Sequence, residues 1–304
     1  LGILDEIYGD EGFLDAAIAY AEKVADVRPL PRVRDLDAKL QEAKDNPGIF
    51  DAMRKKIARK ARNQRAPYAC IEGVEAAVNL PFDEGIEKER ALFRELVGAD
   101  EAKSLRYAFF TERQARNVPD IPKDTAVTKV GKVAVIGGGT MGSGITMTCA
   151  DAGIPVRMLE MNEDALKGAM DRIRNTYEVS VKRGSITSAQ VEERMACITP
   201  VTAYSDLSDC DMVIEAVFER MDVKIPVFKQ LDQAMKQGAI LATNSSALDI
   251  DEIAAVTNRP ESVIGTHFFS PANVMKLLEI VRGEKTSKEI VASCQRFAQQ
   301  IAKV

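Results

Sequence analysis

A glycine-rich turn is the first group of residues in this chain that suggests a chemical role. The segment Gly137 to Gly142 reads G-x-G-x-x-G, directly after an apolar run and directly before a helical pattern. In that context Gly137 predicts a tight turn, Gly139 a close approach of the backbone to a pyrophosphate, and Gly142 close packing of a helix on a strand. Phosphate charge would then lie at the helix N-terminus. The alternative is an ordinary turn that contains three glycines.

Glu160 is the second candidate, because it ends the next apolar run after the glycine turn. A carboxylate there can accept hydrogen bonds from an adenosine ribose, and it repels a 2′-phosphate. Met161 and Asn162 follow it, so no adjacent arginine would bind that phosphate. The pattern favours NAD over NADP as the cofactor. The alternative is a solvated acid at the end of a strand.

His267 is the single histidine of the chain, so histidine chemistry must use it or a partner chain. It ends a predicted strand, and Glu279 follows in the next apolar segment. Removal of hydride from an alcohol carbon needs a base for the hydroxyl proton, and an imidazole oriented by a carboxylate suits that role. From spacing alone, a histidine buried in the core is an equal alternative. Ser245 and Ser246 could add a hydroxyl, although such a pair alone is usually a helix cap.

The pattern beyond residue 127 predicts the scaffold that would position these residues. Short apolar runs alternate with longer amphipathic stretches, which is typical of strands buried on both faces of a parallel sheet. We therefore expect an α/β fold with a doubly wound, mostly parallel sheet of Rossmann type. The interval from Glu163 to Met195 is too long for one crossover helix and predicts a helical pair that turns near Arg183-Gly184. The expected strands are Lys132–Ile136, Ile154–Leu159, Asp211–Val217, Ala239–Thr243, Ser262–Phe268 and Lys276–Val281.

Residues 1 to about 125 predict a mainly helical segment after a strand-like start at Leu1–Ile7. Helical patterns cover Gly12–Asp26 and recur from Ile49, Ile71 and Gly85 onward. Pro119, Pro122 and the small polar residues after them indicate a linker, which places a boundary at residues 126 and 127.

Composition excludes several classes of protein. The 304 residues are 46% hydrophobic and 29% charged, with a net charge of −5, as in globular proteins with room for two domains. There is no apolar run near the roughly 20 residues of a spanning helix, so we expect no membrane span. The five cysteines never form a C-x-x-C pair, which argues against structural zinc, and we expect no metal.

The order and spacing of four segments resemble the NAD domain of L-3-hydroxyacyl-CoA dehydrogenases. The resemblance covers about residues 130 to 304, and the segments are Ala134–Gly142, Val213–Val217, Thr243–Ser246 and His267–Glu279. The His-Phe-Phe-Ser-Pro form looks like the bifunctional branch of fatty acid β-oxidation enzymes, although Ser270 stands where monofunctional relatives carry asparagine. Leu1–Ala25 resembles the tail of a crotonase-like enoyl-CoA hydratase domain, and Pro81–Phe110 resembles the linker that follows it.

The resemblance implies a role for each matching residue. His267 would be the catalytic base, Glu279 its orienting partner, and Ser246 a hydrogen-bond donor to the substrate oxygen. Hydride would pass from C3 of an L-3-hydroxyacyl-CoA to NAD⁺ while His267 takes the hydroxyl proton. Glu219 and Lys224 would lie by the nicotinamide ribose, and Ala216 and Val217 would line the nicotinamide pocket. The other implied cofactor positions are Gly137, Gly139, Thr140, Met141, Gly142, Glu160 and Asn244.

The resemblance also implies partners and a context. We expect an acyl-CoA substrate, a thiolase subunit or a second copy as protein partner, and no nucleic acid. The basic run Arg54–Arg62 is typical of a solvated helix face, and contact with coenzyme A phosphates is the alternative. The cytoplasm is the default location, with the peroxisome as the alternative. Both ends look cut, so we expect a fragment of a longer polypeptide that alone lacks hydratase activity and has little or no dehydrogenase activity.

Two other functions stay open at this stage. One is an NAD-dependent dehydrogenase of another small hydroxy acid, built on the same nucleotide-binding fold. The other is a non-catalytic NAD-binding module whose N-terminal helices serve assembly.

Overall fold

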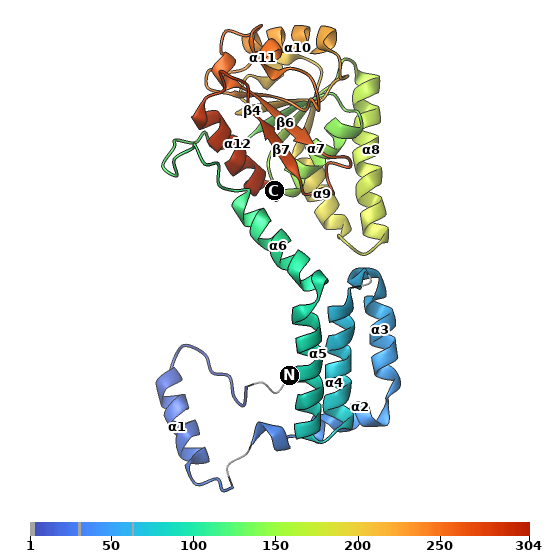
Figure 1. Cartoon of the computed structure of the whole chain (residues 1–304). Helices are drawn as coiled ribbons and strands as arrows, with labels where there is room; N and C mark the ends of the chain where they lie inside the picture. Colours follow the sequence, from blue (N-terminus) through green and yellow to red (C-terminus); the bar gives the residue numbers. More distant parts are fainter. Residues whose placement is uncertain (1–3, 30–31, 63) are drawn as a thin grey trace. The chain divides into compact units, whose positions relative to one another are not determined.

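The computed structural model describes residues 4–29, 32–62 and 64–304. The chain divides into two compact units, Leu1–Phe109 and Phe110–Val304 (Figure 1).

The first unit is helical in the part of the chain that the structure describes. Its α3, α4 and α5 lie side by side in Figure 1, and Phe50, Ile71 and Val78 form a small buried core. The strand-like start was wrong for Leu4–Ile7, which form no strand, because an extended segment without a partner strand has unpaired backbone groups; Leu1–Ile3 lie outside the described residues. The helices are α1 Phe13–Ala25, η1 Val33–Asp35, η2 Ala38–Leu40, α2 Gln41–Asp45, α3 Gly48–Ala61, α4 Arg65–Asn79, α5 Phe82–Gly98 and α6 Asp100–Gln114, which continues into the second unit.

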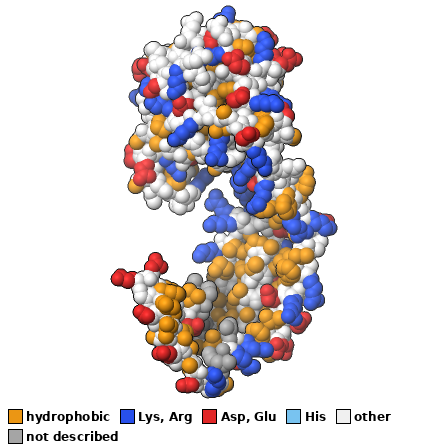
Figure 2. Space-filling view, turned by 90° about the vertical axis from the view of Figure 1, so that its left-hand side faces the viewer, with side chains coloured by type: hydrophobic (Ala, Val, Ile, Leu, Met, Phe, Trp, Pro, Cys, Tyr) orange, Lys and Arg blue, Asp and Glu red, His pale blue; other side chains and the backbone are white. Residues whose placement is uncertain are grey.

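Apolar side chains are exposed over much of this helical unit (Figure 2). No residue of α1 is buried, and its Phe13, Leu14 and Ile18 are each at least half exposed. In the basic run on α3, Arg54 pairs with Asp51 and Glu75, while the neighbouring lysines are exposed.

The second unit holds a seven-stranded sheet in the order β3-β2-β1-β4-β5-β6-β7. All neighbouring pairs are parallel except β6 and β7, which are antiparallel. This arrangement confirms the expected doubly wound, mostly parallel sheet. The strands are β1 Val133–Ile136, β2 Val156–Leu159, β3 Ile198–Val201, β4 Met212–Glu215, β5 Ile240–Thr243, β6 Val263–Phe268 and β7 Leu278–Val281.

Edge strand β3 was missing from the sequence prediction. Its central residues Thr199 and Pro200 are exposed, so the segment lacks the continuous apolar run of a central strand. Proline is tolerated there because an edge strand has one side without a ladder partner.

Helices cover both faces of the sheet. In β1, Val133 and Val135 pack with α7 and α12, whereas Ala134 and Ile136 pack with α10 and α11. The expected helical pair is confirmed as α8 and α9, with Gly184 at φ 67° in the turn between them. The helices are α7 Thr140–Asp151, α8 Glu163–Lys182, α9 Ser188–Ala196, η3 Tyr204–Leu207, α10 Met221–Ala234, α11 Ile250–Ala254, η4 Pro260–Ser262 and α12 Lys288–Gln300.

The segment from 110 to 126 belongs to the second compact unit, whereas the sequence pattern grouped it with the first. Val118 and Ile121 pack against the core beneath α12. Asp120 pairs with Arg282, with 2.8 Å between carboxylate and guanidinium. These contacts with residues far along the chain have no local sequence signal.

Candidate active site at the carboxyl edge of the sheet

The glycine turn has the backbone geometry that its spacing predicts. Gly137 adopts φ +91°, and a Cβ there would lie 2.9 Å from the carbonyl oxygen of Ala216. A Cβ at Gly142 would overlap the carbonyl of Gly137, so only glycine lets α7 start this close to the turn. A Cβ at Gly139, in contrast, would meet no atom of the described residues within 4 Å. An exposed backbone at a helix N-terminus fits a dinucleotide pyrophosphate.

Thr140 and Met141 form the first turn of α7. Thr140 is exposed beside the glycine turn, whereas Met141 is partly buried and packs against the core. Thr140 is therefore accessible to a ligand, while Met141 mainly anchors the helix.

Glu160 lies beside the glycine turn and forms a hydrogen bond with its backbone. Its carboxylate accepts hydrogen bonds from the Gly138 N–H at 2.7 Å and from the Met161 N–H at 3.1 Å. Arg172 of α8 donates to the carbonyl of Gly138 at 2.5 Å. An arginine therefore does lie at this turn, although none follows Glu160 in the sequence. It went unpredicted because the fold, not the local segment, brings α8 there.

His267 and Glu279 lie opposite each other in the antiparallel pair of β6 and β7. Nδ1 of His267 is 2.8 Å from Oε2 of Glu279. The side chain of His267 is 20% exposed and that of Glu279 is 51% exposed, so the histidine is not enclosed in the core. The ring of Phe269 lies 4.6 Å from the imidazole, centroid to centroid. The pair is accessible, and its hydrogen bond leaves Nε2 as the ring nitrogen that can exchange a proton with a substrate.

Asn244 ties the end of β5 to the end of β6. Its side-chain oxygen accepts a hydrogen bond from the Phe268 N–H at 2.9 Å. In this structure the amide therefore holds the backbone next to His267.

Glu219 and the two serines form a hydrogen-bonded group after β4 and β5. The Ser245 hydroxyl donates to Glu219 at 2.6 Å, the Ser246 N–H at 2.8 Å and the Ser246 hydroxyl at 3.4 Å. Burial raises the pKa of Glu219, but these hydrogen bonds and the Lys224 ammonium outweigh it and hold the pKa below its usual range. Glu219 is therefore an anion at neutral pH. Ser246 is exposed, so its hydroxyl can also reach a ligand.

Lys224, expected by the nicotinamide ribose, is buried between two carboxylates. Its side chain is 1% exposed, and its ammonium donates to both carboxylate oxygens of Glu215 at 2.7 and 2.9 Å. It also lies 3.3 Å from Glu219. An ammonium has three N–H donors, and these three contacts account for them. Lys224 therefore acts on the site through Glu219.

Glu215 is the residue of this group that sequence reasoning did not single out as functional. It is fully buried at the end of β4 and also accepts hydrogen bonds from the Thr243 hydroxyl and the Val217 N–H, each at 2.7 Å. In the sequence, Glu215 is distinguished only as an acidic residue at the end of an apolar run. Ala216 and Val217, the predicted nicotinamide-pocket residues, are partly buried between this carboxylate and the glycine turn.

The predicted site residues therefore meet at one edge of the sheet. The parallel strands β1, β2, β4, β5 and β6 end there, and antiparallel β7 starts there. Ligands of doubly wound sheets bind at this edge. In the described part of the chain, no cluster of three or more metal-ligating side chains is found, and no helix is long and apolar enough to cross a membrane.

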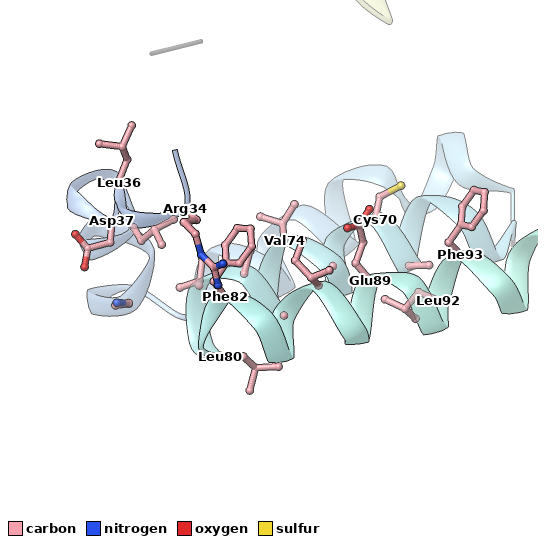
Figure 3. Close-up of a pocket in the computed structure, with 18 of the residues that line it drawn as sticks. Arg34, Leu36, Asp37, Cys70, Val74, Leu80, Phe82, Glu89, Leu92 and Phe93 are labelled. Atoms are coloured by element: carbon pink, nitrogen blue, oxygen red, sulfur yellow. The ribbon is translucent and has the colours of Figure 1, made fainter. Parts of the chain in front are cut away.

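A pocket of about 690 Å³ in the helical unit contains none of the predicted site residues (Figure 3). It lies along α4 and α5, with apolar side chains such as Val74, Leu92 and Phe93 in its lining. The guanidinium of Arg34 stacks 4.4 Å from the ring centroid of Phe82 at one end. The lining also carries the titratable side chains Asp37, Lys44, Cys70 and Glu89.

Known proteins are similar to this chain in sequence, and a solved structure is similar to part of it in fold. The peroxisomal bifunctional enzymes of Cavia porcellus and Homo sapiens are 40% and 37% identical to it over its whole length. The chain spans 42% of the length of each. The (S)-3-hydroxybutyryl-CoA dehydrogenase structure from Ralstonia eutropha is 35% identical, with a TM-score of 0.57, and the match covers 58% of this chain and 62% of that one.

Residues 132–304 match the family described as 3-hydroxyacyl-CoA dehydrogenase, NAD binding domain. The matched region contains the glycine turn, Glu160 and the His267–Glu279 pair. The chain belongs to the 3-hydroxyacyl-CoA dehydrogenase family, of which it carries the NAD-binding domain.

Proposed function

We propose that this chain is part of an enzyme that oxidises L-3-hydroxyacyl-CoA to 3-ketoacyl-CoA with NAD⁺. The observation that carries the proposal is the hydrogen bond between His267 and Glu279 at the sheet edge that also bears the glycine turn. A histidine oriented by a carboxylate is suited to remove the proton of a hydroxyl group. The names of the relatives support a coenzyme A thioester as the substrate class.

Three side chains of the site have separate roles in the proposed reaction. NAD⁺, when bound, accepts the hydride. His267 takes the hydroxyl proton at Nε2, because Nδ1 is held by Glu279. The Glu279 carboxylate orients the ring and stabilises the imidazolium that forms. The Ser246 hydroxyl donates a hydrogen bond to the substrate oxygen.

Other residues of the site hold the cofactor. Gly137, Gly139 and Gly142 admit the pyrophosphate at the start of α7, with Thr140 beside it. Glu160 accepts hydrogen bonds from the adenosine ribose and disfavours a 2′-phosphate. Glu219, held by Ser245 and Lys224, would lie by the nicotinamide ribose, and Ala216 and Val217 would line the nicotinamide pocket.

The remaining parts of the proposal concern the parent protein. Residues 1–126 would be the end of a crotonase-like hydratase domain plus linker, and residues 127–304 the NAD-binding domain of a bifunctional β-oxidation enzyme. The names of the two mammalian relatives support a peroxisomal location over a cytoplasmic one. Association with a thiolase subunit or with a second copy would be resolved by sedimentation of the full-length protein.

A substrate comparison in the full-length protein tests the proposal. NADH absorbance is followed with L-3-hydroxybutyryl-CoA and with free 3-hydroxybutyrate, for wild type and for His267→Ala. We expect oxidation of the thioester only, loss of that activity in the variant, and unchanged NAD binding by calorimetry. Preference for the free acid would favour a dehydrogenase of small hydroxy acids. NAD binding without any oxidation would favour a non-catalytic binding module.

A further inference from the structure

Lys303 is a buried lysine that follows α12 and has no function assigned so far. It is 7% exposed, and Asp151 interacts with its charge without forming an ion pair. Its ammonium instead donates to two backbone carbonyls, those of Ala272 and Met275, each at 2.6 Å. Burial lowers the pKa of Lys303. A buried ammonium is costly unless its donors are satisfied, and these hydrogen bonds satisfy two of its three N–H donors.

Both carbonyls belong to the loop of residues 269–277, which joins β6 to β7. The strand before the loop carries His267 and the strand after it carries Glu279. The loop therefore sets the distance and direction between the two members of the pair.

Val304, the residue after Lys303, forms two backbone hydrogen bonds at the end of the same loop. The Val304 N–H donates to the carbonyl of Lys276, and the Leu278 N–H donates to the carbonyl of Val304, both at 2.8 Å. These hydrogen bonds fix the backbone at the first residue of β7. A slip of one residue there would turn Glu279 to the opposite face of the sheet, because side chains alternate along a strand.

Helix α7 holds the same loop from the other side. The single proton of the Thr148 hydroxyl is shared between the carbonyls of Gly144 at 2.9 Å and Ala272 at 3.1 Å, so Thr148 and Lys303 both approach the Ala272 oxygen. A Cβ at Gly144 would lie 3.1 Å from the Ala272 side chain, which shows how closely the helix approaches the loop. The helix that begins at the glycine turn thus contacts the loop that connects His267 and Glu279.

We propose that Lys303 is a positioning residue for the His267–Glu279 pair, acting through the carbonyls of Ala272 and Met275. This inference rests on the proposed function for its effect on catalysis. Its structural effect on His267 is independent of the substrate.

The single histidine of the chain makes this effect directly observable. The 304-residue chain is prepared without a histidine tag and with ¹³C in the histidine ring, so that NMR detects one ring environment. Lys303→Met removes the ammonium and keeps a linear side chain. Arg259→Met is the control at an equally buried cation. Arg259 also donates to backbone carbonyls, those of Asp232, Met235 and Lys236, and in addition pairs with the Asp232 carboxylate at 2.9 Å.

We expect Lys303→Met to shift or broaden the His267 signal, whereas Arg259→Met lowers the melting temperature and leaves that signal unchanged. In the full-length enzyme, Lys303→Met should lower kcat at least tenfold and change the KM for NAD less than twofold. Thr148→Val removes the other donor to Ala272 and should change the His267 signal in the same direction, even if Lys303→Met fails to fold. An unchanged His267 signal in Lys303→Met, or in Thr148→Val where Lys303→Met does not fold, would overturn the inference. A changed signal, together with no oxidation of hydroxyacyl-CoA by the full-length wild-type protein, would support the positioning role and contradict the proposed function.

Discussion

His267 and Glu279 occupy directly opposed positions of two antiparallel strands, with Nδ1 and Oε2 2.8 Å apart. In such a pair the strand register itself brings the side chains together, because opposed residues on one face are close neighbours. The hydrogen bond therefore depends on pairing between β6 and β7 and on the loop that connects them.

Replacing Glu279 should slow catalysis without weakening the binding of NAD. Glu279→Gln removes the charge that stabilises an imidazolium, so we expect kcat to fall by about 10²-fold while the Kd for NAD is unchanged. Steady-state kinetics and calorimetry on the full-length enzyme measure both. Glu284→Gln, at an exposed acid beyond β7, is the control and should leave both values unchanged. A normal kcat in Glu279→Gln would contradict the orienting role.

Two glycines of the turn should respond differently to alanine. Gly142→Ala would clash with the Gly137 carbonyl and should destabilise the fold by about 1–3 kcal/mol as well as weaken NAD binding. Gly139→Ala meets no atom of the described residues within 4 Å and should leave the melting temperature unchanged. Its methyl group would still obstruct the pyrophosphate, so NAD affinity should fall by about tenfold, or about 1.4 kcal/mol. Unaltered NAD affinity in Gly139→Ala would place the cofactor elsewhere.

The buried pair of Lys224 and Glu215 should be sensitive to loss of one partner. Lys224→Met leaves the Glu215 carboxylate buried without its cation, so the free energy of unfolding should fall by about 3–5 kcal/mol. In the double variant with Glu215→Gln, part of this free energy should be recovered, because burying a neutral amide costs less free energy than burying an unpaired carboxylate. Urea denaturation measures each variant. As a comparison, Arg90→Met breaks an exposed pair with Glu87 and should cost less than about 1 kcal/mol. Equal losses at the two sites would refute the buried-pair assignment.

Glu219 should make the stability of the fold depend on acid pH. Its pKa is lower in the folded protein than in the unfolded chain, so its stabilising contribution is present above the ordinary glutamate pKa of about 4.3. That contribution is lost as the pH falls through the lower folded value. Between about pH 5 and about pH 3, the free energy of unfolding should fall more steeply in wild type than in Glu219→Gln. Parallel pH profiles would show that the hydrogen bonds from Ser245 and Ser246 do not stabilise the anion.

Local sequence was sufficient to predict most of the second unit. Each central strand is a continuous apolar run, and the glycine turn has a spacing that backbone sterics require, so both signals lie within a few residues. Gly137 illustrates this, since its position in the motif predicted a tight turn, and the residue adopts φ 91° there. The shared carboxyl edge of these strands followed from the expected parallel topology, which also explains why His267 and the glycine turn lie at the same edge.

Tertiary structure alone decided the contacts that tune the site. The pairing of Glu215 with Lys224, the approach of Arg172 to Gly138 and the attachment of Lys303 to Ala272 each join residues from different elements. The same holds for Val118 and Ile121, which pack on a core formed by later residues. Whether a lysine is exposed to solvent or buried beside a carbonyl depends on the packing of distant segments, because burial is a property of the assembled core and leaves no local pattern in the sequence.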